Sequence, residues 1–460
     1  MKDFPIEALA EIIKAAHNKN IKGTFTNVST DSRDIKPGEC FFAISGETFD
    51  GHNFVADVFN KGAACAVVSK NVKNIPHGKV ILKVRDTITS LSDFAAAYRR
   101  LNNFKVAAIT GSVGKTTTRQ IAYEVLRRHF RTHTAPKNFN NNIGLPLTLL
   151  GADEKDEIVL TELGTNHRGE IASLSKIAQP DVAVITTVAP AHLEGFGSIE
   201  AILEEKLSIS QGLKRGGVLI INGDNERLVK ACKSKKIKFV SFGESTHCEV
   251  SAQNIRYEQT SSKFVINGTE VTLPLPGPGN VKNALAAFAI CRQFTITAKD
   301  FAEGIKTLSA VPMRTELLKI GSLTIINDCY NANPASMKNA LDILANFAKV
   351  HKRNGRLVFV CGDMAELGHH SESLHKKLGE YAARTGVDVL LAVGKFARTV
   401  AKAAAENTKN QIDIKCFEDT ASVCNNLENF VKDSDIVLVK GSRASKLENV
   451  TQQLKQLFEK

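Results

Sequence analysis

The sequence predicts an α/β protein built from three domains. At roughly 150 residues per domain, a chain of 460 residues has the length of about three domains. Short apolar runs typical of buried strands alternate with helical patterns, which indicates right-handed crossovers and mostly parallel sheets. Polar segments follow several of these runs directly, as at the ligand-binding edge of a doubly wound sheet. We therefore expect a small N-terminal α/β domain, a central domain with a mostly parallel sheet, and a C-terminal Rossmann-like domain.

Residues 1–103 form the first predicted domain, in which turn signals separate short apolar runs. The spacing of apolar residues predicts helices over residues 6–17, Val55–Asn60 and 90–103. Continuous apolar runs predict two buried strands, at residues 40–44 and Cys65–Val68. The last helix leads the chain into the second domain.

The second and third predicted domains, residues 104–311 and 312–460, each alternate strands with helices. The strands expected in the second domain are residues 106–109, 158–160, 182–186 and 218–221. A turn-rich segment then precedes a helix over residues 280–294. The strands expected in the third domain are residues 323–326, Leu357–Cys361, 387–393 and 436–439. This order of elements favours a doubly wound sheet in both domains.

Composition indicates the class of protein, but it does not identify the ligand. Lys and Arg total 60 against 48 Asp and Glu, a net charge of +12, which admits nucleic acid, a membrane surface or anionic small molecules. Trp is absent and Tyr numbers 5, so few rings can stack on bases, and we expect no nucleic acid partner. No apolar run approaches the ~18 residues of a membrane-spanning helix. The nine scattered Cys are typical of reduced thiols, so we expect a cytoplasmic protein without membrane insertion.

The clearest functional signal is a glycine-rich turn between a predicted strand and an amphipathic helix. Its residues are Gly111, Ser112, Val113, Gly114, Lys115, Thr116 and Thr117. Glycines let backbone N–H groups wrap a phosphate, and the start of the helix adds partial positive charge. Lys115 is expected to reach the β- and γ-phosphates of ATP, and the Thr116 hydroxyl to bind Mg²⁺. Only the shorter G-x-x-G-K-T form is met, because Ile109 stands where the longer signature has glycine.

Two further polar residues follow strands of the same predicted sheet. Glu162 ends one strand, and His192 lies just past another. Because the carboxyl ends of parallel strands meet at one edge, both side chains are expected near Lys115 and Thr116. A carboxylate beside a hydroxyl suits Mg²⁺. His192 is a less usual Mg²⁺ ligand, and a structural hydrogen bond explains it equally well.

Amide-rich and polar loops indicate a second ligand surface. Residues 138–142 read Asn-Phe-Asn-Asn-Asn, and a turn or a polar substrate contact explains them equally well. In the third domain, polar segments end three predicted strands, at residues 327–334, 362–364 and 440–443. Each alone is compatible with a capped turn. Three such loops at one sheet edge predict a ligand surface that faces the phosphate loop.

Together these segments resemble the Mur ligases, the ATP-dependent amide-forming enzymes of peptidoglycan synthesis, over nearly the whole chain. In the first domain, T-D-S-R at residues 30–33 carries part of the resemblance. The specific segments are A-H-L-E-G-F-G-S at residues 191–198 and Y-N-A-N-P at residues 330–334. These two are similar to those of family members that add D-alanyl-D-alanine to UDP-N-acetylmuramoyl-tripeptide. The resemblance implies a first domain that binds the uridine nucleotide, a phosphate-loop-type ATPase core, and a C-terminal domain that binds D-Ala-D-Ala and closes over ATP.

The resemblance also implies a mechanism. The tripeptide carboxylate attacks the γ-phosphate of ATP, ADP leaves, and the amine of D-Ala-D-Ala attacks the resulting acyl phosphate. Lys115 would neutralise the phosphates together with Mg²⁺ at Thr116 and Glu162. His192 would bind a second Mg²⁺. Lys206 falls where the family carries a carbamoylated lysine, and is expected among the catalytic residues.

Other site residues are implied by the same resemblance. The ATP site is expected to include Arg314, the ribose-binding Asp328 and the adenine-side Asn280 and Asn283. The substrate sites are expected to include Ser32, Arg33, Gly46, Asp50, His52, Asn140, Asn141, Tyr330, Asn331, Asn333, Lys440, Ser442 and Arg443. The protein is expected to act as a monomer.

Two departures from the family pattern keep alternatives open. The family usually has Lys-Gly-Glu around the modified lysine, where this chain has Lys206-Leu207-Ser208. It often has Gly-Arg-His-Asn before the adenine helix, where this chain reads G-P-G-N at residues 277–280. The leading hypothesis is the D-Ala-D-Ala-adding ligase. The alternatives are another amide ligase of the Mur or folylpolyglutamate type, or a nucleotide-binding relative that has lost catalysis.

Overall fold

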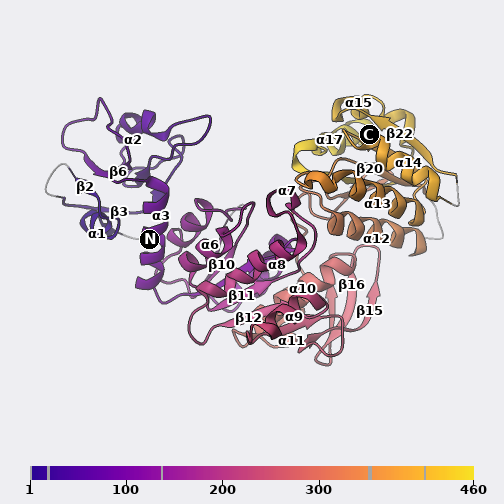
Figure 1. The fold of residues 1–460 in the computed structure, drawn as a ribbon, viewed down its shortest axis with the longest axis horizontal. Helices are drawn as coiled ribbons and strands as arrows, with labels where there is room; N and C mark the ends of the chain where they lie inside the picture. Colours follow the sequence, from indigo (N-terminus) through magenta and orange to yellow (C-terminus); the bar gives the residue numbers. More distant parts are fainter. Residues whose placement is uncertain (1–2, 18–20, 136–137, 351–354, 409–410, 460) are drawn as a thin grey trace.

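The fold was obtained as a computed structural model, which describes residues 3–17, 21–135, 138–350, 355–408 and 411–459. Its main sheets form three successive bodies, and the central body lies between the N-terminal and C-terminal ones (Figure 1). Each body combines helices with a sheet that is mainly parallel, so the predicted three-domain α/β class is confirmed. Among the described helices, none combines the length and the apolar character that crossing a membrane requires.

The N-terminal body is built on a five-stranded sheet with one antiparallel edge strand, β2. The strands run in the order β2 (Ala16–His17), β7 (Val80–Lys83), β6 (Cys65–Val68), β5 (Cys40–Phe42) and β4 (Val28–Ser29). A separate antiparallel pair joins β1 (Phe4–Pro5) to β3 (Thr24–Phe25). The helical elements are α1 (Ile6–Ile12), η1 (Gly51–Phe54), α2 (Val55–Asn60) and α3 (Thr87–Leu101).

Two helix boundaries in this body differ from the prediction. The helix expected over residues 6–17 ends at Ile12, because Lys14 takes a left-handed φ of 52° and Ala16–His17 instead pair with β7. The helix expected from residue 90 begins earlier, at Thr87, where the Asp86 carboxylate accepts the Thr89 N–H at 2.6 Å. A side-chain cap of this kind satisfies an N–H that has no partner within the helix.

The central body contains a seven-stranded sheet in which every neighbouring pair is parallel. The strand order is β14 (Val250–Ser251), β13 (Val240–Gly243), β12 (Val218–Asn222), β11 (Val182–Ile185), β8 (Lys105–Thr110), β10 (Ile158–Glu162) and β9 (Thr132–Thr134). The helical elements are α4 (Lys115–Leu126), α5 (Gly144–Leu150), α6 (Glu170–Ala178), α7 (Leu193–Phe196), α8 (Ile199–Leu207), η2 (Ser208–Gly212), α9 (Glu226–Ser234), α10 (Pro278–Arg292) and α11 (Ala298–Gly304). Because β8 lies between β10 and β11, the segments that follow these three strands meet at one sheet edge.

A second, antiparallel sheet in the central body was not predicted. Its strands are β15 (Gln253–Tyr257), β16 (Ser262–Ile266) and β17 (Thr269–Leu273). Asn267 and Gly268 connect the last two strands with φ of 49° and 76°. Positive φ at both turn residues is typical of a tight hairpin, and the Asn-Gly pair is its sequence signal.

The C-terminal body is a six-stranded sheet with helices packed against it. The strand order is β18 (Glu316–Ile320), β19 (Leu323–Asn327), β23 (Ile436–Lys440), β20 (Leu357–Cys361), β21 (Val389–Val393) and β22 (Asp413–Phe417). Only the hairpin between β18 and β19 is antiparallel among these pairs. The helical elements are α12 (Pro334–Val350), η3 (Gly368–His370), α13 (Ser371–Arg384), α14 (Ala397–Asn407), α15 (Thr420–Cys424), α16 (Leu427–Phe430), η4 (Arg443–Ser445) and α17 (Glu448–Phe458).

Helix α3 joins the N-terminal body firmly to the central one. Its Phe94 and Tyr98 belong to the same buried apolar cluster as Leu149 of α5. The Arg99 side chain is fully buried and ion-pairs with Asp181 at 2.7 Å. It also donates to the carbonyl oxygen of Phe104 at 2.7 Å. Separating Arg99 from Asp181 would leave a buried charge unpaired, which is strongly unfavourable. We therefore expect this joint to be rigid.

Candidate functional site

The glycine-rich segment after β8 adopts the backbone shape of a phosphate-binding loop. Gly111 and Gly114 have φ of 146° and 92°, and a Cβ at Gly111 would lie 1.9 Å from the Thr186 hydroxyl. The Ser112 N–H donates to the Thr187 carbonyl at 2.9 Å, which ties the loop to the neighbouring segment after β11. Lys115 Nζ donates to the Gly111 carbonyl at 2.7 Å, so the ammonium curls over its own loop. Withdrawal of this ammonium from water lowers the pKa of Lys115.

Glu162 lies beside this loop because its strand pairs with β8 in parallel register. The Thr116 hydroxyl donates to Glu162 Oε2 at 3.1 Å. Arg119, which sequence reasoning missed, donates from Nε to Glu162 Oε1 at 2.7 Å. Arg119 stands three residues after Thr116, so one helix face presents both partners to the carboxylate. The guanidinium also donates to the Ala135 carbonyl at 2.9 Å, and the Glu162 side chain is only 3% exposed.

His192 and Lys206 complete this part of the site. His192 follows β11 and caps α7 with a left-handed φ of 53°. Its Nδ1 atom is buried and pairs with Glu366 Oε2 of the C-terminal body. Lys206 is 2% exposed in α8. Burial, together with the nearby charge of Lys115, holds the pKa of Lys206 well below its usual value.

A cavity of about 590 Å³ brings these groups together between the central and C-terminal bodies. The predicted residues that line it are Ser112, Val113, Gly114, Lys115, Thr116, Asn140, Asn141, Glu162, His192, Lys206, Arg314, Tyr330, Asn331 and Asn333. Asn141 Oδ1 accepts the Gly144 N–H at 2.8 Å, so this amide caps α5 as well as facing the cavity. The segments that follow β8, β10 and β11 therefore share one cavity with polar residues of the C-terminal body.

A neighbouring cavity of about 340 Å³ lies beside the start of α10. The predicted residues around it are Val113, Gly114, Thr117, Asn280, Asn283, Arg314, Asp328, Tyr330, Asn331 and Lys440. Lys440 is 1% exposed and donates to Asp328 Oδ2 at 2.6 Å and to the Asn331 carbonyl at 3.0 Å. Lys440 thus holds the Asp328–Asn331 loop in place. The Arg314 guanidinium stacks over the Tyr330 ring at 4.2 Å.

The altered segment before α10 has a structural consequence. The Gly279 N–H donates to Asn339 Oδ1 of α12 at 2.8 Å, and a Cβ at Gly279 would lie 2.5 Å from that oxygen. A Cβ at Gly277 would lie 2.3 Å from Ile343 of the same helix. The two glycines therefore allow α12 of the C-terminal body to pack directly on the start of α10.

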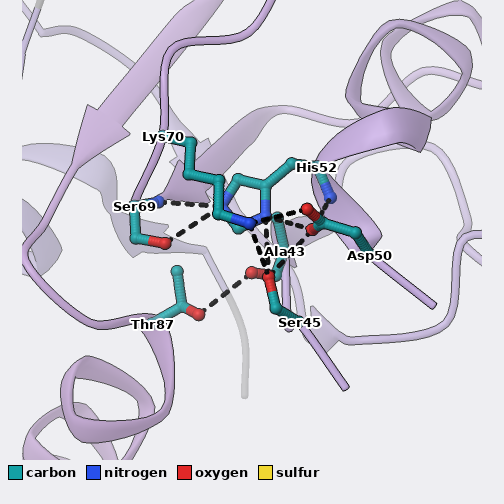
Figure 2. Close-up of polar contacts among 7 residues, drawn as sticks. All are labelled: Ala43, Ser45, Asp50, His52, Ser69, Lys70 and Thr87. Atoms are coloured by element: carbon teal, nitrogen blue, oxygen red, sulfur yellow. Dashed lines mark hydrogen bonds and ion pairs between the residues drawn. The ribbon is translucent and has the colours of Figure 1, made fainter. Parts of the chain in front are cut away.

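The predicted residues of the N-terminal body lie outside both cavities. Asp50 accepts hydrogen bonds from Ser45 Oγ at 2.9 Å and Lys70 Nζ at 2.8 Å, and its Oδ1 lies 2.6 Å from His52 Nδ1 (Figure 2). His52 Nε2 accepts the Ser69 N–H at 2.9 Å, so the ring proton is placed on Nδ1. Gly46 closes the same loop through its N–H to the Phe49 carbonyl at 2.8 Å.

The T-D-S-R segment forms a second polar group on this body. Arg33 pairs with Asp31 at 2.6 Å, and the pair is largely exposed. Hydrogen bonds from Arg33 lower the pKa of Asp31 to about 2. Lys61 Nζ donates to the Ser32 carbonyl at 2.8 Å. The Arg33 side chain is 85% exposed, so it is available to an anionic group.

Two residues predicted in the C-terminal body also lie outside the two shared cavities. Ser442 lines a third cavity, of about 860 Å³, which the segments after β20, β21, β22 and β23 surround. Arg443 points to Glu448, with Nη1 3.1 Å from Oε1. Its guanidinium also lies 6.0 Å from the Tyr330 ring.

The fold and site define a three-domain nucleotide-dependent enzyme class, and comparison with known proteins names the family. Models of a Mur ligase middle domain, a Mur ligase glutamate ligase domain and a Mur ligase family catalytic domain match residues 109–291, 313–443 and 24–99. A UDP-N-acetylmuramoyl-tripeptide–D-alanyl-D-alanine ligase of Bacillus subtilis is 36% identical over 98% of both chains. The corresponding ligase of Escherichia coli is 33% identical over 94% of both chains. The chain belongs to the Mur ligase family.

Solved structures are similar over the same length. A crystal structure of MurF from Acinetobacter baumannii has a TM-score of 0.90 and 32% identity, covering 99% of both chains. A MurF ligase of Thermotoga maritima, solved in complex with ADP, has a TM-score of 0.81 and 27% identity, covering 94% of this chain and 98% of the other. The similarity therefore extends through all three bodies.

Proposed function

We propose that this protein is an ATP-dependent ligase that adds D-alanyl-D-alanine to UDP-N-acetylmuramoyl-tripeptide, with ADP and phosphate as the other products. The observation that carries the proposal is full-length similarity to ligases of that name, combined with one cavity that gathers Lys115, Glu162, His192 and Lys206. Phosphoryl transfer depends mainly on positioning and charge neutralisation, and the residues of this cavity can supply both.

The reaction runs in two steps. A carboxylate oxygen of the tripeptide attacks the γ-phosphorus of ATP, the bond to the β-phosphate oxygen breaks, and ADP leaves. The amine of D-Ala-D-Ala then attacks the acyl carbon, the bond to the phosphate oxygen breaks, and the amine loses a proton. Lys115 and the N–H groups of the phosphate loop stabilise the charge that develops on the transferred group. Arg119 fixes the Glu162 carboxylate.

The residues present fit Mg²⁺, which the family implies. Mg²⁺ in nucleotide sites is held by one or two carboxylates together with substrate phosphates. Glu162 with the Thr116 hydroxyl would hold one ion, and the buried His192 Nδ1, which lies beside the Glu366 carboxylate, would help to hold a second. Among the described residues, no cluster of three or more His, Cys, Asp or Glu forms a metal site by itself. When bound, Mg²⁺ supplies positive charge to the phosphate oxygens.

Lys206 is the candidate for carbamoylation. A carbamate forms when an uncharged amine attacks CO₂ and releases a proton, so an amine with a lowered pKa is the reactive form. Lys206 is 2% exposed and its pKa is lowered by burial. The carbamate would place a negative charge beside the cations of the cavity.

Outside the reaction cavity, Asp328 would hold the ribose, and Asn280 and Asn283 would face the adenine. Ser32, Arg33, Gly46, Asp50 and His52 would bind the uridine nucleotide on the N-terminal body. Since ATP and a nucleotide-linked precursor are both cytoplasmic metabolites, we place the reaction in the cytoplasm. We also propose that the monomer is active, because the three bodies of one chain supply every predicted site.

The test is ADP release with each substrate supplied and omitted. Release that requires both UDP-N-acetylmuramoyl-tripeptide and D-Ala-D-Ala supports the proposal. Release that requires single amino acids or a folate substrate would assign the chain to another amide ligase. ATP binding without turnover on any of these substrates would identify a relative that has lost catalysis.

A further inference from the structure

The acceptor amine needs a binding group beside the cations of the reaction cavity. Lys115 and Arg314 line this cavity. The amine of a dipeptide enters as an ammonium ion at neutral pH, since an α-amino group has a pKa near 8. Like charges repel most strongly where water is excluded. A carboxylate on the approach route would offset this repulsion.

Three carboxylates line this cavity in the described part of the chain, and two of them are held by partners within the central body. Glu162 is bonded to the Thr116 hydroxyl and to Arg119. Glu170 Oε2 accepts the N–H groups of Asn166 at 2.7 Å and His167 at 2.9 Å. The third carboxylate, Glu366, pairs across the two bodies with His192 Nδ1, yet its side chain is 51% exposed. Only this one comes from the C-terminal body.

Glu366 stands where two cavities meet. It lines the reaction cavity and also the cavity of about 860 Å³ that the C-terminal body forms at the carboxyl ends of its strands. Among the other acids of that second cavity, Asp363 is engaged by the N–H groups of Lys395 at 2.8 Å and Phe396 at 3.0 Å. Glu194, Glu418 and Asp419 do not line the reaction cavity. Glu366 is therefore placed to contact a ligand that extends from the C-terminal cavity into the reaction cavity.

The backbone around Glu366 is fixed by contacts between the two bodies. Its carbonyl accepts the Glu194 N–H at 3.0 Å, and its own φ is 60°. His192, which faces its carboxylate, also has a left-handed φ, of 53°. A Cβ at Gly368 would lie 3.3 Å from Glu194 Cα, so the two loops approach closely. Non-glycine residues held in this conformation are concentrated at functional sites.

We propose that Glu366 binds the ammonium group of the incoming acceptor and positions it at the junction of the two cavities. This inference rests on the proposed function. It assigns Glu366 a specificity role: acceptors that carry a free α-amino group are selected by a carboxylate of the C-terminal body, while acyl phosphate formation is left to the central body.

The test separates the two steps by the choice of nucleophile. In Glu366→Gln, the KM for D-Ala-D-Ala is expected to rise about tenfold or more, as for loss of a hydrogen bond to a charged group. Hydroxylamine is uncharged at neutral pH and captures an acyl phosphate as a hydroxamate. With UDP-tripeptide and hydroxylamine, the rates of ADP release and hydroxamate formation are expected to stay within about twofold of the wild-type rates. Glu428→Gln, which changes an exposed acid of α16 that lines neither cavity, is the matched control and should leave both reactions unchanged.

Two outcomes would overturn the inference. An unchanged KM for the dipeptide would exclude Glu366 from ammonium binding. An equal loss of activity with D-Ala-D-Ala and with hydroxylamine would show that Glu366 acts through domain docking or acyl phosphate formation instead. Failure of the proposed function is distinguishable, because the wild-type protein itself would then release no ADP in response to D-Ala-D-Ala.

Discussion

At the scale of single residues, the site depends on ionisable groups that are held by named partners. Glu162 and His192 were predicted from their positions after strands, because the ends of parallel strands meet at one edge. Arg119 was missed, since an arginine within an amphipathic helix is typical of a solvated face. Its partner, Glu162, comes 43 residues later. The structure alone brings the two together, as it does Glu366 and His192.

Lys115 gives the most direct residue-scale prediction. Lys115→Ala removes a cation from the phosphate loop, so the rate of ADP release should fall on the order of a hundredfold or more. Folding should be retained, because the lost hydrogen bond is to the loop's own Gly111 carbonyl. Steady-state kinetics and thermal unfolding measure the two effects.

The matched control is Lys235→Ala, which removes an exposed lysine paired with Glu204 on the surface. This variant should keep wild-type turnover. Full turnover in Lys115→Ala would show that the phosphate-loop assignment is wrong.

At the scale of elements, strands that are buried on both faces are predicted from the sequence better than partly exposed strands and the ends of helices. The strand Leu357–Cys361 was predicted with its observed bounds, because it is a continuous apolar run. The antiparallel sheet β15–β17 was missed. Its strands are partly exposed and have mixed patterns, and only Asn267-Gly268 marks the hairpin. The packing of α12 on α10 was also beyond sequence reasoning, since it joins Gly279 to a residue 60 positions later.

The contact between α10 and α12 gives an element-scale prediction. Gly279→Ala would place a Cβ 2.5 Å from Asn339 Oδ1, so either the Asn339 side chain must give up its hydrogen bond to the Gly279 N–H or α12 must shift. We expect a loss of stability of about 1–3 kcal/mol, as for overpacking, and a several-fold rise in the KM for ATP. Thermal unfolding and ATP titration provide the measurements.

A double variant checks the cause of this effect. Asn339→Ala removes the crowding that Gly279→Ala creates. Asn339→Ala should therefore reduce the free energy of unfolding less in the Gly279→Ala variant than in wild type. Simple additivity of the two effects would mean that these residues do not compete for the same space.

At the scale of the whole molecule, the predicted sites are distributed over three bodies that are joined in different ways. The N-terminal body is held by the buried Arg99 pair and by shared apolar core. The C-terminal body meets the central one through the packing of α12 on α10 and through polar contacts. These include Asn333 Nδ2 to the Ser112 carbonyl at 3.3 Å and Glu194 N–H to the Glu366 carbonyl. Partly polar interfaces between domains are typical of domains that move, so the C-terminal body is expected to carry the motion.

Ligand binding should therefore compact the molecule. With a non-hydrolysable ATP analogue and UDP-tripeptide bound, the radius of gyration from small-angle X-ray scattering should decrease, because ligands that contact two bodies favour their closed arrangement. The free protein and the protein with UDP alone are the controls. An unchanged radius with both ligands bound would contradict closure.

The shared cavity is expected to activate a carboxylate by phosphoryl transfer from ATP. Mass spectrometry can follow a heavy oxygen isotope placed in the terminal carboxylate of the UDP-tripeptide during turnover with ATP and D-Ala-D-Ala. The label is expected to appear in the released inorganic phosphate, because the bond between the acyl carbon and the phosphate oxygen is the one that breaks. Amide product formed with no label in inorganic phosphate would contradict it.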